Sequence, residues 1–153
     1  MTPSDKYLLF RLEKVLFGVH ILEVSEILGQ IQLTPVPQSP SYIAGMMTVR
    51  GEPLIIMDLR KRFHFASRDP DLNSRVVVVK EQVGERLGLL VDAVQEIVRI
   101  TGDTIREPGE LIHQVGIEKR YLRGVAILRE QPLFVIDTLQ LLSGEETELK
   151  RAA

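Results

Sequence analysis

Few side chains in this sequence could do chemistry, and their spacing assembles no familiar catalytic or metal site. The three histidines, His20, His64 and His113, are far apart and lack the four-residue helical spacing at which two imidazoles bind one zinc ion. Asp58 and Asp137 could form a pair of catalytic carboxylates, but each directly precedes a short helix-like run and has a sufficient role as its N-cap. We therefore expect packing or surface histidines, capping aspartates and no metal.

Nucleophiles and phosphate-binding loops have equally little support. The chain has no cysteine, and no serine lies in a G-x-S-x-G setting. The stretch "VGERLG" lacks both the lysine and the strand-to-helix context of a phosphate loop. The sequence thus predicts no catalytic residue, no cofactor and no enzymatic activity.

One basic run could bind nucleic acid. Arg60, Lys61 and Arg62 are followed by Phe63 and Phe65, and basic side chains beside aromatic ones suit phosphates and bases. The chain nevertheless carries a net charge of −2, which provides no positive field. We favour a solvated helix face with the aromatic rings packed inward. A nucleic-acid-binding module remains an alternative, as does a small-molecule-binding barrel, although small barrels are usually filled by side chains.

Length and hydropathy bound the domain organisation and the location. A chain of 153 residues with 44% hydrophobic content can form one compact domain or two small interdependent halves. No run approaches the ~18 apolar residues of a membrane span, and the N-terminus lacks a signal-peptide pattern. We therefore expect a cytoplasmic protein without direct membrane insertion.

The chain contains an internal repeat. "YIAGMMTVRGEPLIIMD" (42–58) and "YLRGVAILREQPLFVID" (121–137) share six identities in 17 positions, and "FGVHILEVSEI" (17–27) matches "LGLLVDAVQEI" (87–97) with four. The blocks have the same order in both halves, so each pair should superpose in the structure. The second half has a longer connection, 98–120, which is the best candidate for a long loop.

Each half is predicted to be mostly strands. Short apolar runs bounded by Gly, Pro or charged pairs lie at 7–13, 15–19, 45–49, 53–57, 75–80, 88–91, 124–128 and 132–136. Residues 13–14 and 50–52 are predicted hairpin turns. Short helices should follow the two capping aspartates, at 59 to about 63 and at 138–142, the second ended by Ser143-Gly144. Two similar halves of about five strands each suggest two small barrels that share a core seam.

Four segments together resemble the CheW-type chemotaxis coupling family. They are "FRLEKVLFGVHILEVSEIL" (10–28), "TPVPQSPSYIAGMMTVRGEPLIIMDLRKRF" (34–63), "RLGLLVDAVQEIVRI" (86–100) and "YLRGVAILREQPLFVID" (121–137). The most specific parts are the P-x-x-P-x-[YF]-I-x-G stretch (37–45), the R-G hairpin and the V-D-x-V-x-E-[IV] block (91–97).

The resemblance implies a fold and a role. The fold would be mostly β, with two pseudo-symmetric SH3-like five-stranded barrels and short helices in a single domain, 1–145, followed by a tail, 146–153. The role would be a non-enzymatic adaptor between the cytoplasmic tip of methyl-accepting chemoreceptors and the regulatory domain of a CheA-type histidine kinase. The chain has no room for a kinase core or a receiver domain, so a stand-alone coupler fits better than a fusion.

The resemblance also implies a receptor-binding site at Arg50, Val24, Glu26 and Gly45. An arginine can present up to five donors to carboxylates and helix carbonyls, which lysine would not reproduce. Val24 would add an apolar contact and Glu26 a charge, whereas Gly45 would permit a tight chain reversal needed for folding or for contact. Arg129, at the same repeat position as Arg50, is expected to be a solvent-facing hairpin residue.

Kinase binding is harder to place from the sequence. Apolar strand edges at Ile27, Leu28, Ile31 and 122–127 could pair with the kinase's regulatory domain. The same residues could equally be core, so they define no committed site.

Overall fold

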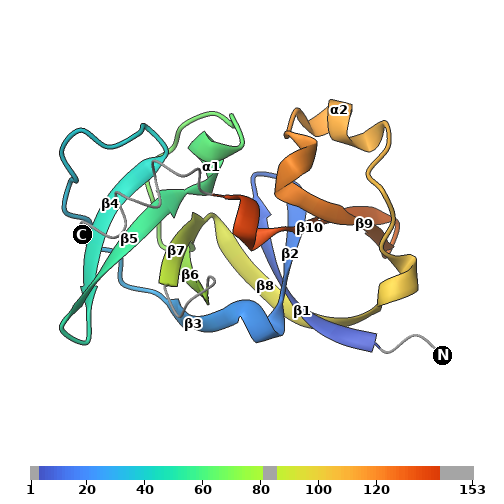
Figure 1. Cartoon of the computed structure of the whole chain (residues 1–153), viewed down its shortest axis with the longest axis horizontal. Coiled ribbons are helices and arrows are strands. Elements are labelled where there is room, and N and C mark those ends of the chain that lie inside the picture. Colours follow the sequence, from blue (N-terminus) through green and yellow to red (C-terminus); the bar gives the residue numbers. More distant parts are fainter. Residues whose placement is uncertain (1–3, 81–85, 142–153) are drawn as a thin grey trace.

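Ten β-strands make up most of the chain that the computed structural model describes, residues 4–80 and 86–141 (Figure 1). The strands are β1 (Ser4–Leu12), β2 (Val15–His20), β3 (Val24–Leu28), β4 (Ile43–Val49), β5 (Glu52–Asp58), β6 (Arg75–Lys80), β7 (Arg86–Val91), β8 (Ala93–Thr101), β9 (Leu122–Leu128) and β10 (Gln131–Ile136). The helices are short: α1 (Leu59–Arg62), α2 (Leu111–Val115) and the 3₁₀ turns η1 (Ile21–Glu23), η3 (Gly102–Thr104), η4 (Lys119–Tyr121) and η5 (Thr138–Gln140).

The strands form two five-stranded sheets, each of which wraps into a small barrel. The first barrel has the order β8-β1-β2-β10-β9 and the second β3-β6-β7-β5-β4. Figure 1 shows the second barrel on the left, with β4 and β5, and the first on the right, with β9 and β10. The expectation that each sequence half forms one barrel is therefore wrong. Each barrel takes two strands from one half and three from the other, joined by the parallel pairs β2–β10 and β5–β7.

The internal repeat is confirmed in strand order and register. Val135 pairs with Gly18 in the first barrel, and the corresponding residues Ile56 and Gly88 pair in the second. The backbone N–H of the aspartate that ends each block, Asp58 or Asp137, donates to the tyrosine carbonyl that begins it, at 2.7 and 2.8 Å. The two barrels are thus related by the repeat, although neither is built from one repeat alone.

The apolar core has three parts. One cluster fills each barrel, and the largest cluster lies between the barrels and draws residues from both. Phe17 is central to this shared cluster, with its ring centroid 5.5–6.1 Å from those of Phe10, Phe63 and Phe134. Burying each such ring contributes about 1.5–3 kcal/mol. The predicted core seam is therefore confirmed, and it ties the barrels into one unit.

Local signals predicted most of the elements. All eight apolar runs lie largely or wholly in strands, and 13–14 and 50–51 are two-residue turns. The strands β3 and β8 were not among the predicted runs, because polar residues interrupt the apolar ones along both strands, where exposed positions alternate with partly buried ones. The 98–120 connection is not a plain loop, because it contains the end of β8, both helical turns η3 and η4, and α2.

The two aspartates cap helices as predicted. The Asp58 carboxylate accepts from the backbone N–H of Arg60 at 3.0 Å, and Asp137 accepts from that of Leu139 at 3.3 Å. Burial raises the pKa of Asp58, against hydrogen bonds from the backbone of α1 that lower it. The last residue of the predicted second helix, Leu142, the Ser143-Gly144 stop and the 146–153 tail lie outside the described residues.

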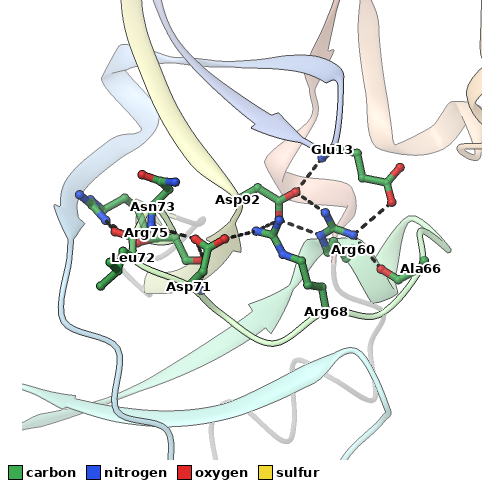
Figure 2. Close-up of polar contacts among 10 residues, drawn as sticks. Glu13, Arg60, Ala66, Arg68, Asp71, Leu72, Asn73, Arg75 and Asp92 are labelled. Atoms are coloured by element: carbon green, nitrogen blue, oxygen red, sulfur yellow. Dashed lines mark hydrogen bonds and ion pairs between the residues drawn. The ribbon is translucent and has the colours of Figure 1, made fainter.

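The basic run on α1 does not form a solvated face, which corrects the sequence prediction. Lys61 is exposed, but Arg60 is buried and binds both carboxylate oxygens of Asp92 through one edge of its guanidinium, Nε to Oδ1 at 2.7 Å and Nη2 to Oδ2 at 2.5 Å (Figure 2). Its Nη1 donates to Glu13 at 3.2 Å and to the Ala66 carbonyl at 2.9 Å. Arg60 is buried because these acceptors replace water, and it links α1 to the β1–β2 turn and the β7–β8 corner.

Arg62 is buried for a different reason. Its guanidinium lies between the rings of Tyr42 and Tyr121, 4.0 and 4.9 Å from their centroids, and its Nε donates to the Leu141 carbonyl at 2.8 Å. The two tyrosines occupy the same position in the two repeats, so Arg62 stacks between the halves. Desolvation lowers the pKa of Arg62. The predicted inward packing of Phe63 and Phe65 is confirmed.

Candidate partner-binding surface

Arg50 lies at the tip of the β4–β5 hairpin. Arg50 and Gly51 both have positive φ, 50° and 80°, as a two-residue turn of this kind requires. The Arg50 side chain is 71% exposed. The hairpin therefore projects a cation from the second barrel toward solvent.

Glu26 lies on β3, at the opposite edge of the same sheet. The Nη2 group of Arg50 donates to Oε2 of Glu26, so this ion pair joins the β4–β5 turn to the edge strand β3 of the same barrel. The Glu26 side chain is only 19% exposed. The structure thus brings together two of the four residues predicted to bind a receptor.

The second repeat contains a matching pair in the first barrel. Arg129 donates to Glu96 at 2.7 Å, again between the hairpin tip and the opposite edge strand. This hydrogen bond lowers the pKa of the Glu96 carboxyl. Arg129 is exposed, as predicted, and both Arg129 and Glu130 have positive φ without a glycine.

The other two predicted residues, Val24 and Gly45, are partly buried and buried, respectively. Val24 begins β3, is half-buried and packs against the shared core. Gly45 lies inside β4 with φ 150°, so the expected chain reversal is wrong. A Cβ at Gly45 would lie 2.8 Å from the Thr34 carbonyl, and the backbones of Thr34 and Met46 pair there. Gly45 is needed because the 34–46 bridge brings two backbones together.

Two charged residues at this site, Arg86 and Glu52, were not identified from the sequence as site residues. Arg86, the first residue of β7, lies with its Nη1 3.9 Å from Oε1 of Glu26 and its Nη2 3.4 Å from Oε2 of Glu52. The sequence did contain one indication of Arg86, because this charged residue replaces the apolar Leu16 that occupies the same position in the other repeat.

A shallow apolar hollow lies beside η1, the turn that leads into Val24. Its volume is about 460 Å³, and Lys6, Ile21, Ile97, Val98 and Arg99 line it. Ile97 is 54% exposed and Leu22, in η1, is 76% exposed. Three apolar side chains and two cations therefore line the hollow.

The residues considered for kinase binding divide into two groups. Ile27 and Ile127 are exposed on edge strands, 43% and 64%. Leu28 and Ile31 pack against the core of the second barrel, and Leu122, Val125 and Ala126 are buried.

His20 caps a helical turn, and the other two histidines lie on the surface. His20 accepts from the backbone N–H of Leu22 through Nδ1, which caps η1, and its Nε2 lies 3.4 Å from Asp5. His64 and His113 are exposed. Among the described residues, no cluster of three His, Cys, Asp or Glu could hold a metal ion. Over the same residues, no helix is long and apolar enough to span a membrane.

Comparison with known proteins decides the family. A family model described as a CheW-like domain matches residues 6–146. This chain belongs to the CheW-like family. It is 34% identical over 149 residues to the chemotaxis protein CheW of Klebsiella aerogenes, covering 97% of this chain and 87% of that protein. It is 33% identical to a probable chemotaxis protein CheW of Rhizobium etli, covering 97% and 94%.

A solved structure agrees with the CheW-like assignment. The crystal structure of the scaffolding protein TtCheW from Thermoanaerobacter tengcongensis matches with a TM-score of 0.84 and 28% sequence identity. The match covers 94% of this chain and 90% of that one. Together the CheW relatives and the fold identify a coupling adaptor of chemotaxis, and none of these comparisons favours a small-molecule or nucleic-acid-binding barrel.

Proposed function

We propose that this CheW-like chain is a non-enzymatic adaptor in the cytoplasm. It joins the cytoplasmic tip of methyl-accepting chemoreceptors to the regulatory domain of a CheA-type histidine kinase, within a two-component signalling array. The family match over residues 6–146 and the two-barrel fold support this role. Coupling would be mechanical, because a rigid pair of barrels with a shared core can transmit a change in one partner's position to the other.

The observation that carries the receptor-binding proposal is the exposed Arg50 at the tip of the β4–β5 hairpin. Its guanidinium uses one contact on Glu26 and keeps further donors for a partner. A hydrogen bond to a charged group contributes about 1.5–3 kcal/mol. Receptor carboxylates and helix carbonyls are suitable acceptors for an arginine.

The remaining site residues support this contact. Val24 and the hollow beside η1 offer apolar side chains together with the cations Lys6 and Arg99, which suits an acidic amphipathic helix. Gly45 contributes to this part of the barrel by letting the Thr34 backbone approach β4. For the kinase we propose a contact through the edge strands, where Ile27 and Ile127 are exposed.

Reconstitution tests the adaptor role. Kinase should sediment with receptor-containing membranes when the adaptor is present, and much less when it is left out. The purified adaptor alone should neither hydrolyse ATP nor transfer phosphate. Equal kinase recovery with and without adaptor would contradict the proposal, as would phosphoryl transfer by the adaptor itself.

A further inference from the structure

The two symmetry-related carboxylates differ in the number of arginines that face them. Glu96 pairs with Arg129. Glu26 pairs with Arg50 through Oε2, and the guanidinium of Arg86 lies 3.9 Å from its other oxygen, Oε1. The position of Arg86 is taken in the first barrel by Leu16, whose side chain is buried in the barrel core. The second cation is therefore a property of one repeat only.

The second arginine matters for Glu26 because Glu26 is more deeply buried than Glu96. The Glu26 side chain is 19% exposed and that of Glu96 is 35% exposed. The Oε1 atom of Glu26 is buried and accepts no hydrogen bond among the described residues. A carboxylate left buried without a cation is strongly destabilising, whereas a partly exposed one is hydrated.

The contact of Arg50 with Glu26 competes with any contact that Arg50 makes with a partner. Turning its guanidinium to a partner's carboxylate breaks the bond to Oε2 and leaves Glu26 less compensated. Arg86 is placed to take over, because its side chain is 25% exposed and its Nη1 needs to move about 1 Å to reach hydrogen-bond distance. Glu52, 74% exposed, accepts from Nη2 of Arg86 at 3.4 Å.

We propose that Arg86 is a positioning residue that keeps Glu26 charge-paired when Arg50 turns to a partner's carboxylate. The inference rests on the proposed receptor-binding function of Arg50. It also explains why Arg50, and not the equivalent Arg129, is the partner-binding arginine. Arg129 has no second arginine at the Leu16 position to release it from Glu96.

A thermal double-mutant cycle tests the charge pairing without any receptor. Arg50→Ala and Arg86→Leu should each lower the Tm by at most about 2 °C, because the other arginine still compensates Glu26, whereas the double variant should lower it by about 6 °C or more. The part of the double variant's Tm loss that exceeds the sum of the two single losses should vanish in a Glu26→Gln background, because no glutamate charge is then left unpaired. Additive losses, or an excess that persists with Glu26→Gln, would overturn the proposal.

Receptor binding tests the positioning role. Arg86→Leu should weaken co-sedimentation with receptor-containing membranes by about 10-fold, and Arg86→Lys should recover most of that loss because it restores the charge. Lys80→Leu, at the position paired with Arg86 on β6, is the matched control and should bind normally. Normal binding by a folded Arg86→Leu protein would overturn the positioning role. Failure of the wild type to bind would refute the receptor function, while the thermal cycle still decides the charge pairing.

Discussion

The buried Arg60–Asp92 pair should be the largest single polar contribution to stability. Replacing Asp92 with Asn keeps the shape of the side chain but removes the negative charge that Nε and Nη2 of Arg60 contact. Side-chain exposure is 7% for Arg60 and 13% for Asp92, so water replaces little of the lost interaction. We expect Asp92→Asn to fold but to unfold at a clearly lower temperature.

The magnitude follows from the contacts. Breaking a buried ion pair by removing one partner costs about 3–5 kcal/mol. Glu13 remains 3.2 Å from Arg60 and still offsets part of the charge, which favours the lower end, about 3 kcal/mol. For a chain of this size that corresponds to a loss of about 6–12 °C in Tm.

A thermal melt at neutral pH measures the effect, with Glu118→Gln as control. Glu118 pairs with Arg120 at 2.7 Å, but both side chains are more than half exposed, so its loss should cost about 0–1 kcal/mol. Equal, small shifts in the two variants would refute the claim that burial makes the Arg60–Asp92 pair strong.

The same pair should make stability depend on pH. Burial alone would raise the pKa of Asp92, but hydrogen bonds from Arg60 and the Glu13 backbone, with the charges of Arg60 and Arg68, lower it below its ordinary value of 3.8. The stabilisation is therefore present above pH 3.8 and is lost as the pH falls through the lower folded-state pKa. The Tm gap between wild type and Asp92→Asn should be constant near neutrality and should narrow under strong acid. A gap that stays constant into strong acid would contradict this linkage.

Two backbone predictions concern the hairpins and the bridge behind them. Gly45→Ala should destabilise the fold by about 1–3 kcal/mol, because the new methyl group meets the Thr34 carbonyl at positive φ. In the same urea titration Gly29→Ala, which meets only Arg75 side-chain atoms at 3.8 and 3.9 Å, should change little, and equal effects would contradict the close-approach argument. Glu130→Gly should stabilise by about 0.5–1 kcal/mol, because the left-handed conformation costs a side chain roughly 1–2 kcal/mol and glycine's extra entropy about 0.5–1 kcal/mol. Gly51 already occupies the matching turn position, so Gly51→Glu should lower the stability of the fold. A loss of stability in both variants would contradict this reasoning.

Local features of this fold could be predicted from the sequence, because neighbouring residues determine them. The Glu13-Lys14 turn, the Arg50-Gly51 turn and the Asp58 cap each depend on a few adjacent residues. The repeat could be predicted as well, because its identities lie at fixed spacing. Which strands share a barrel could not, since the β2–β10 and β5–β7 pairings join segments that are distant in sequence.

The candidate site could be predicted only in part for the same reason. Arg50 and Glu26 were found through the family resemblance, and the structure places them in contact. Arg60 was misjudged because a charged run is normally solvated, and its acceptor Asp92 lies 32 residues away in the chain. Arg86 on β7 reaches Glu26 on β3 past the intervening strand β6, and the sequence distinguishes Arg86 only by its difference from Leu16 in the other repeat.

Receptor binding by Arg50→Glu tests the central claim most directly. The variant and the matched Arg129→Glu carry the same charge reversal at the same hairpin position of the two repeats, each beside a paired glutamate. Co-sedimentation with receptor-containing membranes should fall by about 10- to 150-fold for Arg50→Glu, from a contact of roughly 1.5–3 kcal/mol, and should change little for Arg129→Glu. Both variants should melt as similarly folded proteins and should still bind the kinase's regulatory domain. Wild-type receptor affinity in folded Arg50→Glu, or an equal loss in both variants, would contradict the account.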